Sequence, residues 1–355
     1  NKIFWKTIKE IDEKFWSLKK LYYSKYSMSS YLKTISSSCE LLLTFGLDLF
    51  KSADSFINQM LPGISKEYKE FIDSQLLITI QSRTSGIPLL SLALGLAYPF
   101  HDVFYVNGGM GAIFDQLLKD INVHNKESIL KIQKENDLYR VVSNKDDYLT
   151  KSVVLNSSLY DSASLFEDEE IKKYYNSFSV TDQSAFVMYL TLNSKEEFLN
   201  HYQIILNKKI PNSISNSFFI SFSSKEDEKL SKNGYSITIS THTKASYWKN
   251  LSKQEYEKEK KRTEDFILKS MLFNLESIKK EDIINIFSAT STTFKRYINR
   301  YNCGGRAITL RNILQTPSCT TPFKGIYNIG DTIFAGQGWP GVAIGVKILN
   351  KELND

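Results

Sequence analysis

The sequence predicts a mixed α/β fold, and three observations on its apolar residues indicate this class. In residues 1 to about 100, large apolar side chains recur at three- and four-residue steps, the period of amphipathic helices. From His101 the period changes, and short apolar runs alternate with turns and helices. Near the C-terminus, a strand-like run at 325–329 leads through a glycine-rich turn into helical spacing at 343–349. We therefore expect a helical region followed by mixed sheet and helix.

The N-terminal region is predicted to contain several amphipathic helices. The first has one apolar face, formed by Ile3, Phe4, Ile8, Ile11, Phe15, Leu18 and Leu21. A second apolar stretch covers residues 41–50 and is interrupted by Asp48, and a further helix is expected to start after Ser65 as its N-cap. Two interpretations of these helices stay open: ordinary core packing, or a lid that dips into a membrane and admits a lipid-like substrate.

The middle of the chain predicts strands and helices in alternation. A strand is expected at 103–106, a turn at 108–111, a helix at 112–119 and short strands at 129–132, 139–142 and 152–156. The turn at 108–111 is alternatively a helix C-cap or a hairpin turn. Further strands are expected at 186–192, 218–223 and 236–240, with a charged helix from Gln254 to about Leu275. Its Lys/Glu run is interpreted as a solvated helix face.

The C-terminal turn carries the most informative motif. Gly336, Gly338 and Gly341 satisfy the pattern G-x-G-x-x-G of a dinucleotide-binding turn. A first Rossmann βα turn needs a further strand and an acidic residue about 20 positions downstream, and the residues after Val342 are too few for this. The motif instead indicates the closing segment of a flavin domain, with Asp331 accepting a hydrogen bond from a ribityl hydroxyl.

The glycines of this turn would let the backbone approach the flavin ring, and the helix beginning near Gly341 would aim its amides at the pyrimidine edge. Such a dipole favours the negative charge of reduced flavin by roughly 0.3–1 kcal/mol. A glycine-rich turn that merely joins strand to helix is the alternative. The candidate cofactor-binding residues here are Gly330, Asp331, Gly336, Gln337, Gly338, Trp339, Gly341 and Val342.

The segment resembles the C-terminal flavin motif of the carotenoid desaturase and isomerase family, the phytoene-desaturase-type FAD oxidoreductases. The turn Gly108-Gly109-Met110-Gly111 is similar to a second motif of that family. Weaker similar patches lie at 184–190, 217–223, 240–243 and 293–297, the last leading to Gly304-Gly305, and all follow the family's order. The chain is most similar to the carotenoid 3′,4′-desaturase branch, with the prolycopene-isomerase branch close behind.

The resemblance implies FAD as cofactor and a hydrophobic carotenoid as substrate. It implies desaturation, by hydride transfer from a C–C bond to the flavin, and alternatively cis–trans isomerisation on reduced flavin. It adds Gly109, Met110 and Ile129 to the cofactor-binding residues, with the Ile129 backbone near the adenine. It also implies peripheral membrane contact, at a cytoplasmic or thylakoid/plastid face. The catalytic residues stay unknown.

The same resemblance implies a domain organisation. Residues 1–100 would form a helical lid or substrate-domain region in contact with the membrane, and 101–160 a segment of the FAD domain. Residues 161–300 would form a substrate domain whose sheet floors the substrate cavity beneath the N-terminal helices. Residues 301–355 would close the FAD domain.

One departure from the family is large. No strand, G-x-G-x-x-G and helix precede Gly108, although family members begin with this unit and use it to bind the ADP half of FAD. The chain begins at Asn1 rather than Met, so we expect the C-terminal part of a longer protein or a shortened homologue. A non-catalytic homologue acting as a binding subunit is the alternative from another class of function.

Composition narrows the possible classes of function. The net charge is +6 with 42% apolar and 24% charged residues, ordinary for a globular protein, and no basic cluster interleaved with aromatic residues indicates nucleic-acid binding. Three cysteines and four histidines have no metal-ligand spacing, so no metal site is expected. No apolar run reaches about 18 residues, so no membrane span is predicted. His242 is interpreted as structural or, alternatively, as an acid–base group beside the substrate.

Overall fold

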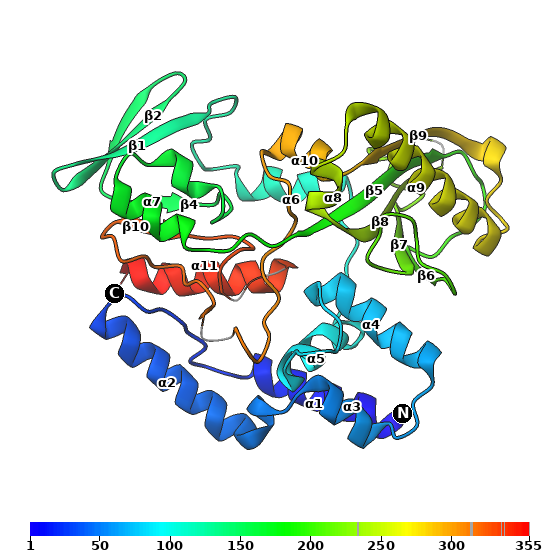
Figure 1. The fold of residues 1–355 in the computed structure, drawn as a ribbon, viewed down its shortest axis with the longest axis horizontal. Coiled ribbons are helices and arrows are strands. Elements are labelled where there is room, and N and C mark those ends of the chain that lie inside the picture. Colours follow the sequence, from blue (N-terminus) through cyan, green and yellow to red (C-terminus); the bar gives the residue numbers. More distant parts are fainter. Residues whose placement is uncertain (233, 313–314, 335, 337, 355) are drawn as a thin grey trace. The chain divides into compact units, whose positions relative to one another are not determined.

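The structure is a computed structural model that describes residues 1–355 except 233, 313–314, 335, 337 and 355. The chain forms two compact units, and each combines segments that are distant in sequence (Figure 1). Unit 1 contains residues 1–101, 125–181 and 304–355, and unit 2 contains residues 102–124 and 182–303.

Among the residues described, unit 1 contains five α-helices and two 3₁₀ helices (labelled η) before its first strand. Its elements are α1 (Lys2–Trp16), α2 (Met28–Phe45), η1 (Gly46–Phe50), α3 (Ala53–Met60), α4 (Lys66–Ile80), α5 (Leu89–Leu96), η2 (Tyr98–Phe100), β1 (Ile129–Glu135), β2 (Leu138–Ser143), β3 (Asp147–Thr150), β4 (Val153–Leu155), η3 (Ser162–Leu165), α7 (Glu169–Asn176), β10 (Ile326–Asn328) and α11 (Gly338–Asn354). The helical character predicted for the first hundred residues is confirmed.

The N-terminal helices share one apolar core. Phe4 and Ile8 of α1 pack with Ile57 of α3, Ile72 of α4 and Leu92 of α5, and all five side chains are almost fully buried. The predicted start of α4 is also confirmed, because the Ser65 hydroxyl accepts a hydrogen bond from the Tyr68 amide at 3.2 Å. A serine in this position satisfies one of the unpaired amides of the first helical turn.

The remainder of unit 1 is built around two small sheets. Strands β1, β2 and β3 form an antiparallel sheet, and β4 pairs with β10 in parallel although the two are far apart in sequence. Helices α7 and α11 supply the apolar side chains that pack on the parallel pair; the core of this region includes Ile326, Ile333, Ile348 and Leu349. The predicted strands at 129–132, 139–142 and 152–156 correspond to β1, β2 and β4.

Unit 2 is a five-stranded antiparallel sheet with its main helix packed against it. Its elements are α6 (Met110–Leu117), β5 (Gln183–Leu192), β6 (His201–Ile205), β7 (Ser217–Phe222), β8 (Tyr235–Lys244), α8 (Ala245–Lys249), α9 (Lys253–Asn274), η4 (Lys280–Asp282), β9 (Ile283–Ala289) and α10 (Ser291–Ile298). The strand order is β6-β7-β8-β5-β9.

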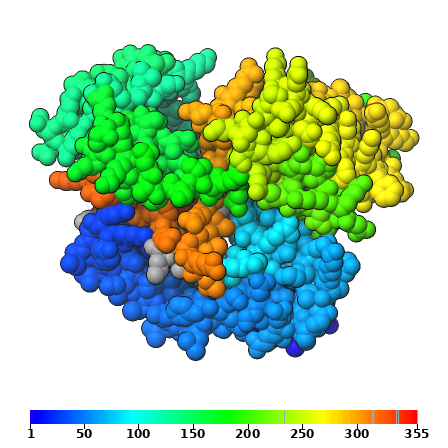
Figure 2. Space-filling view, in the orientation of Figure 1, coloured from blue at the N-terminus to red at the C-terminus, as the bar shows by residue number. Residues whose placement is uncertain are grey.

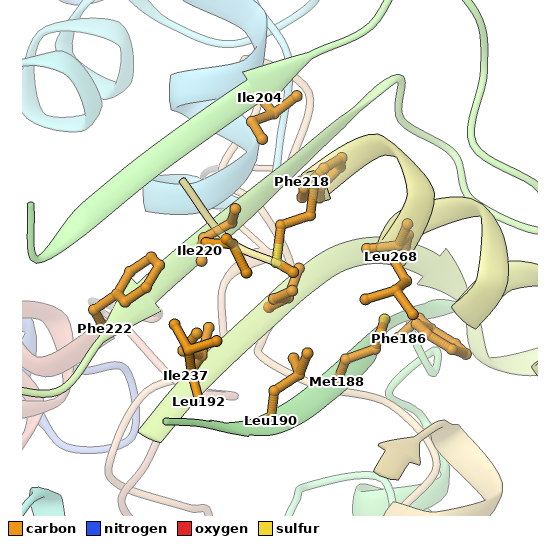
Figure 3. Close-up of a cluster of buried hydrophobic side chains, with 14 of the residues drawn as sticks. Phe186, Met188, Leu190, Leu192, Ile204, Phe218, Ile220, Phe222, Ile237 and Leu268 are labelled. Atoms are coloured by element: carbon orange, nitrogen blue, oxygen red, sulfur yellow. The ribbon is translucent and has the colours of Figure 1, made fainter. Parts of the chain in front are cut away.

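The core of unit 2 lies between this sheet and α9. Alternate residues of β5, such as Phe186 and Met188, and of β7, such as Phe218 and Ile220, point to one face, where they meet Leu268 of α9 (Figure 3). The period-two burial confirms the strands predicted at 186–192, 218–223 and 236–240, because successive strand side chains face opposite sides of a sheet.

The expected strand at 103–106 is wrong. These residues form no regular structure, and Val103 and Phe104 are 68% and 82% exposed. The physical reason is a partner distant in sequence: the Tyr105 hydroxyl and the Gly108 amide both donate to the Asp227 carboxylate, which holds this segment by a side chain rather than by a neighbouring strand. The turn after it does open a helix, α6, as expected.

Candidate functional site

The site is built on the ends of the parallel strands β10 and β4. The Ile329 amide donates to the Leu155 carbonyl at 2.9 Å, which extends the pairing to the last residue before the glycine-rich turn. Gly330 follows with a φ of +106°, and a Cβ at this position would lie 2.7 Å from the Asn156 side-chain oxygen. Glycine is therefore required, and the chain leaves both strands at the same edge. Carboxyl ends of parallel strands are the usual place for ligands in α/β folds.

Gly304 and Gly305 approach this edge from another part of the chain. A Cβ on Gly305 would lie 1.9 Å from the Asp331 carbonyl oxygen, and a Cβ on Gly304 would lie 2.3 Å from the Gln81 side-chain amide. Because neither glycine carries a side chain, the end of α4 and the Gly330–Asp331 turn can both pack closely against Gly304 and Gly305.

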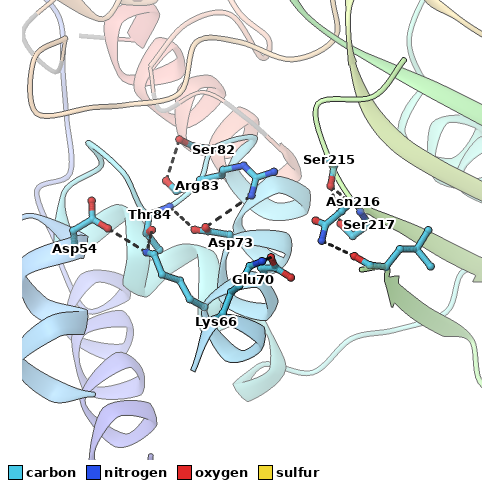
Figure 4. A network of polar contacts seen from close by, with 12 residues as sticks. Asp54, Lys66, Glu70, Asp73, Ser82, Arg83, Thr84, Ser215, Asn216 and Ser217 are labelled. Atoms are coloured by element: carbon cyan, nitrogen blue, oxygen red, sulfur yellow. Dashed lines mark hydrogen bonds and ion pairs between the residues drawn. The ribbon is translucent and has the colours of Figure 1, made fainter. Parts of the chain in front are cut away.

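A polar network fastens the turn that follows Gln81 to α4 (Figure 4). Gln81 ends α4 in the left-handed region, at a φ of 53°. The buried Asp73 carboxylate accepts a hydrogen bond from the Thr84 amide at 2.9 Å, and Lys69 donates to the Thr84 hydroxyl at 2.7 Å. Because both partners of Thr84 come from α4, the turn after Gln81 is held against its own helix.

A small cavity of about 40 Å³ lies beside Asp331. Its polar lining comes mainly from the C-terminal segment and includes Arg306, Asn312, Gln315 and Asp331. Thr332 also lines the cavity, and its buried hydroxyl accepts a hydrogen bond from the Leu159 amide at 3.3 Å. The lining therefore offers polar groups to a ligand beside Asp331.

A larger pocket of about 430 Å³ adjoins this cavity. Arg306, Ile308 and Gly336 line both spaces, so the two meet at these residues. The walls of the larger pocket are largely apolar and come from three N-terminal helices and the tail: Phe15, Trp16, Ile78, Thr79, Ile80, Ser91, Leu94, Tyr98, Ala307, Gly338, Pro340, Gly341 and Ile344. The volume lies within the range of ligand pockets, roughly 300–1,000 Å³.

Two glycines at the N-terminus of α11 line the larger pocket. This helix runs for 17 residues from Gly338, and Gly338 and Gly341 line the pocket. Its first amides have no partner within the helix, and the aligned peptide dipoles give this end a partial positive charge. Gly345 keeps α11 close to the turn, because a Cβ there would lie 3.1 Å from the Phe334 carbonyl oxygen.

The structure places four of the predicted tail residues at the two spaces: Asp331, Gly336, Gly338 and Gly341. Gly330 instead shapes the turn beside Asn156. Trp339 is half exposed and Val342 partly buried. Gln337 lies outside the described residues.

The other three predicted residues lie elsewhere in the chain. Gly109 and Met110 begin α6 in unit 2, where Gly109 packs against Leu230 and Met110 is half exposed. Ile129 begins β1 in unit 1 and is 40% exposed. Their contact with a cofactor stays a prediction.

The Asp227 carboxylate accepts a hydrogen bond from the first amide of the Gly108–Gly111 turn. The Gly108 amide donates to it at 2.6 Å and the Tyr105 hydroxyl at 2.8 Å. These hydrogen bonds, led by that from Gly108, hold the pKa of Asp227 below its usual value. The turn is therefore anchored to the unit that contains it by a carboxylate.

Sequence reasoning missed the apolar half of the site. Phe15 was assigned only to a helix face, and Arg306 was not singled out, although it directly follows Gly304-Gly305. Helical spacing shows that a side chain lies on an apolar face, but several distant segments must meet before that face becomes a pocket.

The residues present fit the ring and ribityl part of a flavin. They offer Asp331 and other polar residues at a small cavity, bare backbone at Gly336 and Gly338, the positive end of α11 and an adjoining apolar space. Among the described residues, β4 and β10 form the one parallel strand pair, and the Gly330–Asp331 turn of the site follows the end of β10.

No family model matches the chain. It is 24% identical over 300 residues to a chloroplastic prolycopene isomerase of Daucus carota, an alignment that covers 78% of this chain and 48% of the relative. The chain spans about half the length of the curated relatives it matches.

Solved structures share the fold at low identity. Cyclohexylamine oxidase from Brevibacterium oxydans IH-35A has a TM-score of 0.54 at 11% identity, covering 99% of this chain and 75% of the oxidase. A fatty acid isomerase from P. acnes has a TM-score of 0.52 at 12% identity, covering 99% and 85%. The predicted fold class is confirmed: the chain has a mixed α/β fold of the FAD/NAD(P)-binding type.

Proposed function

We propose that this chain forms the flavin-ring and substrate-binding part of an FAD-dependent enzyme acting on a carotenoid-like polyene. The observation that carries the proposal is the junction of two spaces at Arg306, Ile308 and Gly336: the small cavity at Asp331, whose lining mixes polar and apolar residues, and the largely apolar pocket of about 430 Å³. A flavin needs both kinds of surface, and a polyene needs the apolar one. The similarity to a prolycopene isomerase supports the same proposal.

Between the two reactions considered, cis–trans isomerisation is favoured by the curated relatives, which are prolycopene isomerases. Desaturation of a carotenoid C–C bond, including the 3′,4′ type, stays a prediction. A bound flavin would supply two-electron redox chemistry for either reaction.

The tail residues would hold and orient the flavin. Asp331 would accept a hydrogen bond from a ribityl hydroxyl, an interaction with a charged acceptor that contributes about 1.5–3 kcal/mol. The positive end of α11 would lie beside the electron-rich edge of the ring and favour negative charge there by about 0.3–1 kcal/mol. Gly336 and Gly338 would allow the ring to approach the backbone.

The helices of unit 1 would hold the polyene and exclude water. Phe15, Ile80 and Leu94 present apolar surface to the pocket, and burial of apolar area contributes about 25 cal/mol per Å². Tyr98 also lines the pocket, where its hydroxyl donates to Gln75, and burial raises its pKa. Tyr98 therefore stays protonated at neutral pH, and the pocket wall gains no negative charge from it.

Flavin binding tests the first half of the proposal. In the complete protein, Asp331→Asn should raise the Kd for FAD about tenfold, because the hydrogen bond accepted by the carboxylate is replaced by the weaker one accepted by a neutral amide oxygen. Asp137→Asn is the matched control, since Asp137 lies in the exposed turn between β1 and β2 and does not line the two spaces described. Fluorescence titration gives both constants. Equal affinity for wild type and Asp331→Asn would contradict the role given to Asp331.

Pigment conversion tests the second half. The complete reading frame, including whatever precedes Asn1, is expressed in cells that accumulate a poly-cis carotenoid precursor. Conversion to the all-trans pigment supports isomerisation, and a product with more conjugated double bonds supports desaturation. Unchanged pigment with flavin bound would refute a carotenoid substrate. Pigment that stays unchanged without bound flavin would favour the non-catalytic binding subunit.

A further inference from the structure

Arg306 lies where the apolar pocket meets the cavity at Asp331. It lines both spaces, and it is the one charged side chain among the described residues that line the larger one. The segment from Gly304 onwards reaches the surface of unit 1 beside the N-terminal helices, and Figure 2 shows it in orange next to the blue and cyan helices. Pockets with largely apolar walls use a few polar groups to fix the orientation of their ligand. A single arginine in such walls therefore bears on which ligand the pocket accepts.

Three other polar side chains of the pocket donate their hydrogen bonds to the protein itself. The Trp16 indole donates to the buried Asp12 carboxylate at 3.0 Å, and the Thr79 hydroxyl donates to the Gln75 backbone carbonyl at 3.1 Å. The Tyr98 hydroxyl donates to the side-chain oxygen of Gln75. Each of these groups has one N–H or O–H to give. All three donors are therefore used within unit 1 and are not left over for a ligand.

The Arg306 guanidinium differs from these three groups. It carries five N–H donors and a permanent positive charge, and its side chain makes no hydrogen bond or ion pair within the part of the chain that the structure describes. Ser91 adds only a neutral hydroxyl to the lining. The N-terminus of α11 carries a partial charge of the same sign as Arg306 and does not neutralise it. The pocket thus combines apolar walls with one positive charge whose donors are available.

A pure hydrocarbon is a poor match for this combination. If it filled the pocket as far as Arg306, it would remove water from the guanidinium and offer no acceptor in return, which is unfavourable. A carboxylate accepts two parallel hydrogen bonds from an arginine and also supplies the opposite charge. A neutral hydroxyl supplies one weaker acceptor and no charge. The lining therefore favours an apolar molecule that ends in a carboxylate.

We propose that Arg306 binds the carboxylate of an otherwise apolar ligand, and that the substrate is a polyene acid rather than a polyene hydrocarbon. The preference for a carboxylate stands on Arg306 and the lining of the pocket. That this ligand is the substrate rests on the proposed function. Because Arg306 lines both spaces, the acid end would lie at their junction, with the polyene along apolar walls such as Phe15, Ile80 and Leu94.

A matched pair of polyenes tests the preference for a carboxylate. All-trans-retinoic acid and all-trans-retinol share one polyene and differ in the terminal group, and each is titrated into the full chain without flavin. Trp16 lines the pocket, so quenching of tryptophan fluorescence reports binding there. The acid should bind about 10- to 100-fold more tightly than the alcohol, because its hydrogen bonds to arginine are charge-assisted. Dissociation constants that agree within about threefold in the wild type would overturn the proposal.

Variants assign the preference to Arg306. Arg306→Gln should bind the acid no more tightly than the alcohol, with the affinity for the alcohol unchanged. Arg306→Lys should keep only part of the preference, because a lysine keeps the charge but not the paired donors. Arg311→Gln is the matched control: Arg311 is an exposed arginine of the same segment that does not line the two spaces described. Loss of the preference in Arg311→Gln would overturn the proposal, since the acid would then respond to surface charge.

A substitution in the apolar wall tests that both ligands occupy the pocket. Leu94 lines it, and Leu94→Trp should weaken the acid and the alcohol by the same factor, because the larger side chain takes up their space. Unchanged binding of both ligands would place them elsewhere and overturn the proposal. The wild-type ratio and Leu94→Trp decide the question even if an Arg306 variant does not fold.

A reduced flavin ring is the other source of negative charge for Arg306. In the complete protein, the Kd values for oxidised and reduced FAD should agree within about threefold between wild type and Arg306→Gln. A variant that binds reduced FAD about tenfold more weakly and keeps the preference for the acid would assign Arg306 to the flavin and overturn the proposal. The retinoid titrations use neither flavin nor pigment conversion. A wild type that binds FAD and converts pigment without preferring the acid would therefore refute this inference and leave the proposed function standing.

Discussion

Replacing Gly305 by alanine tests the packing that places Asp331. The added Cβ would lie 1.9 Å from the Asp331 carbonyl oxygen and 3.2 Å from the Thr332 Cα. Both neighbours are backbone atoms of the segment that follows β10, so no side chain can rotate away to make room. Overpacking costs about 1–3 kcal/mol, and we expect the upper end because the contact is far inside van der Waals distance.

This loss should lower the melting temperature of unit 1 by about 6–12 °C, from roughly 2–4 °C per kcal/mol for a unit of this size. This destabilisation is opposite in sign to the usual effect of a Gly→Ala substitution. At a site whose backbone accepts alanine, the substitution stabilises the protein by about 0.4–1 kcal/mol, because it lowers the conformational entropy of the unfolded chain. Gly111→Ala provides the contrast: a Cβ there meets nothing within 4 Å, so stability should be unchanged or slightly higher.

Thermal unfolding followed by circular dichroism measures both variants. Because the shifted Asp331 backbone would also displace the carboxylate, Gly305→Ala should weaken FAD binding in the complete protein as well. A melting temperature within about 1 °C of wild type would refute the close approach of Gly305 to the Asp331 turn.

Two further predictions follow from buried hydrogen bonds. Tyr175→Phe should destabilise unit 1 by about 1–3 kcal/mol, measured by urea unfolding. The Tyr175 hydroxyl donates at 2.9 Å to the side-chain oxygen of buried Asn328, whose amide nitrogen has no partner among the described residues. A loss of stability below about 0.5 kcal/mol would contradict this prediction. Asp227→Asn should lower the melting temperature of unit 2 at neutral pH. Since the pKa of Asp227 is depressed in the folded state, its contribution is fully present above the unfolded value of about 4 and is lost as the pH falls through the folded value. The difference between wild type and Asp227→Asn should therefore shrink on acidification, and a constant difference would refute the assignment.

Local patterns predicted most of the secondary structure correctly. The helical period of the first hundred residues, the N-cap at Ser65 and the alternation along β5, β7 and β8 all appear in the structure. The strand, turn and helix of the tail appear as β10, residues 329–337 in part, and α11. These features depend on neighbours within a few positions, which the sequence displays directly.

The errors and omissions have a common physical cause. Residues 103–106 have strand-forming side chains, but a hydrogen bond to Asp227, more than a hundred positions away, holds them instead. The edge strands β6 and β9 were not predicted, because pairing along one side only leaves weak alternation in their burial. Long-range partners decide such segments, and a single sequence does not display them.

The sequence by itself determined most of the helices and strands and the glycine-rich tail, because propensity, capping and periodicity act over a few residues. Only the tertiary structure decided that Gly305 lies against Asp331, that three N-terminal helices complete a pocket with the tail, and that Arg306 lies where this pocket meets the cavity at Asp331. Those outcomes depend on which distant surfaces meet, since the free energy of burying a helix face is set by its partner and not by the helix alone.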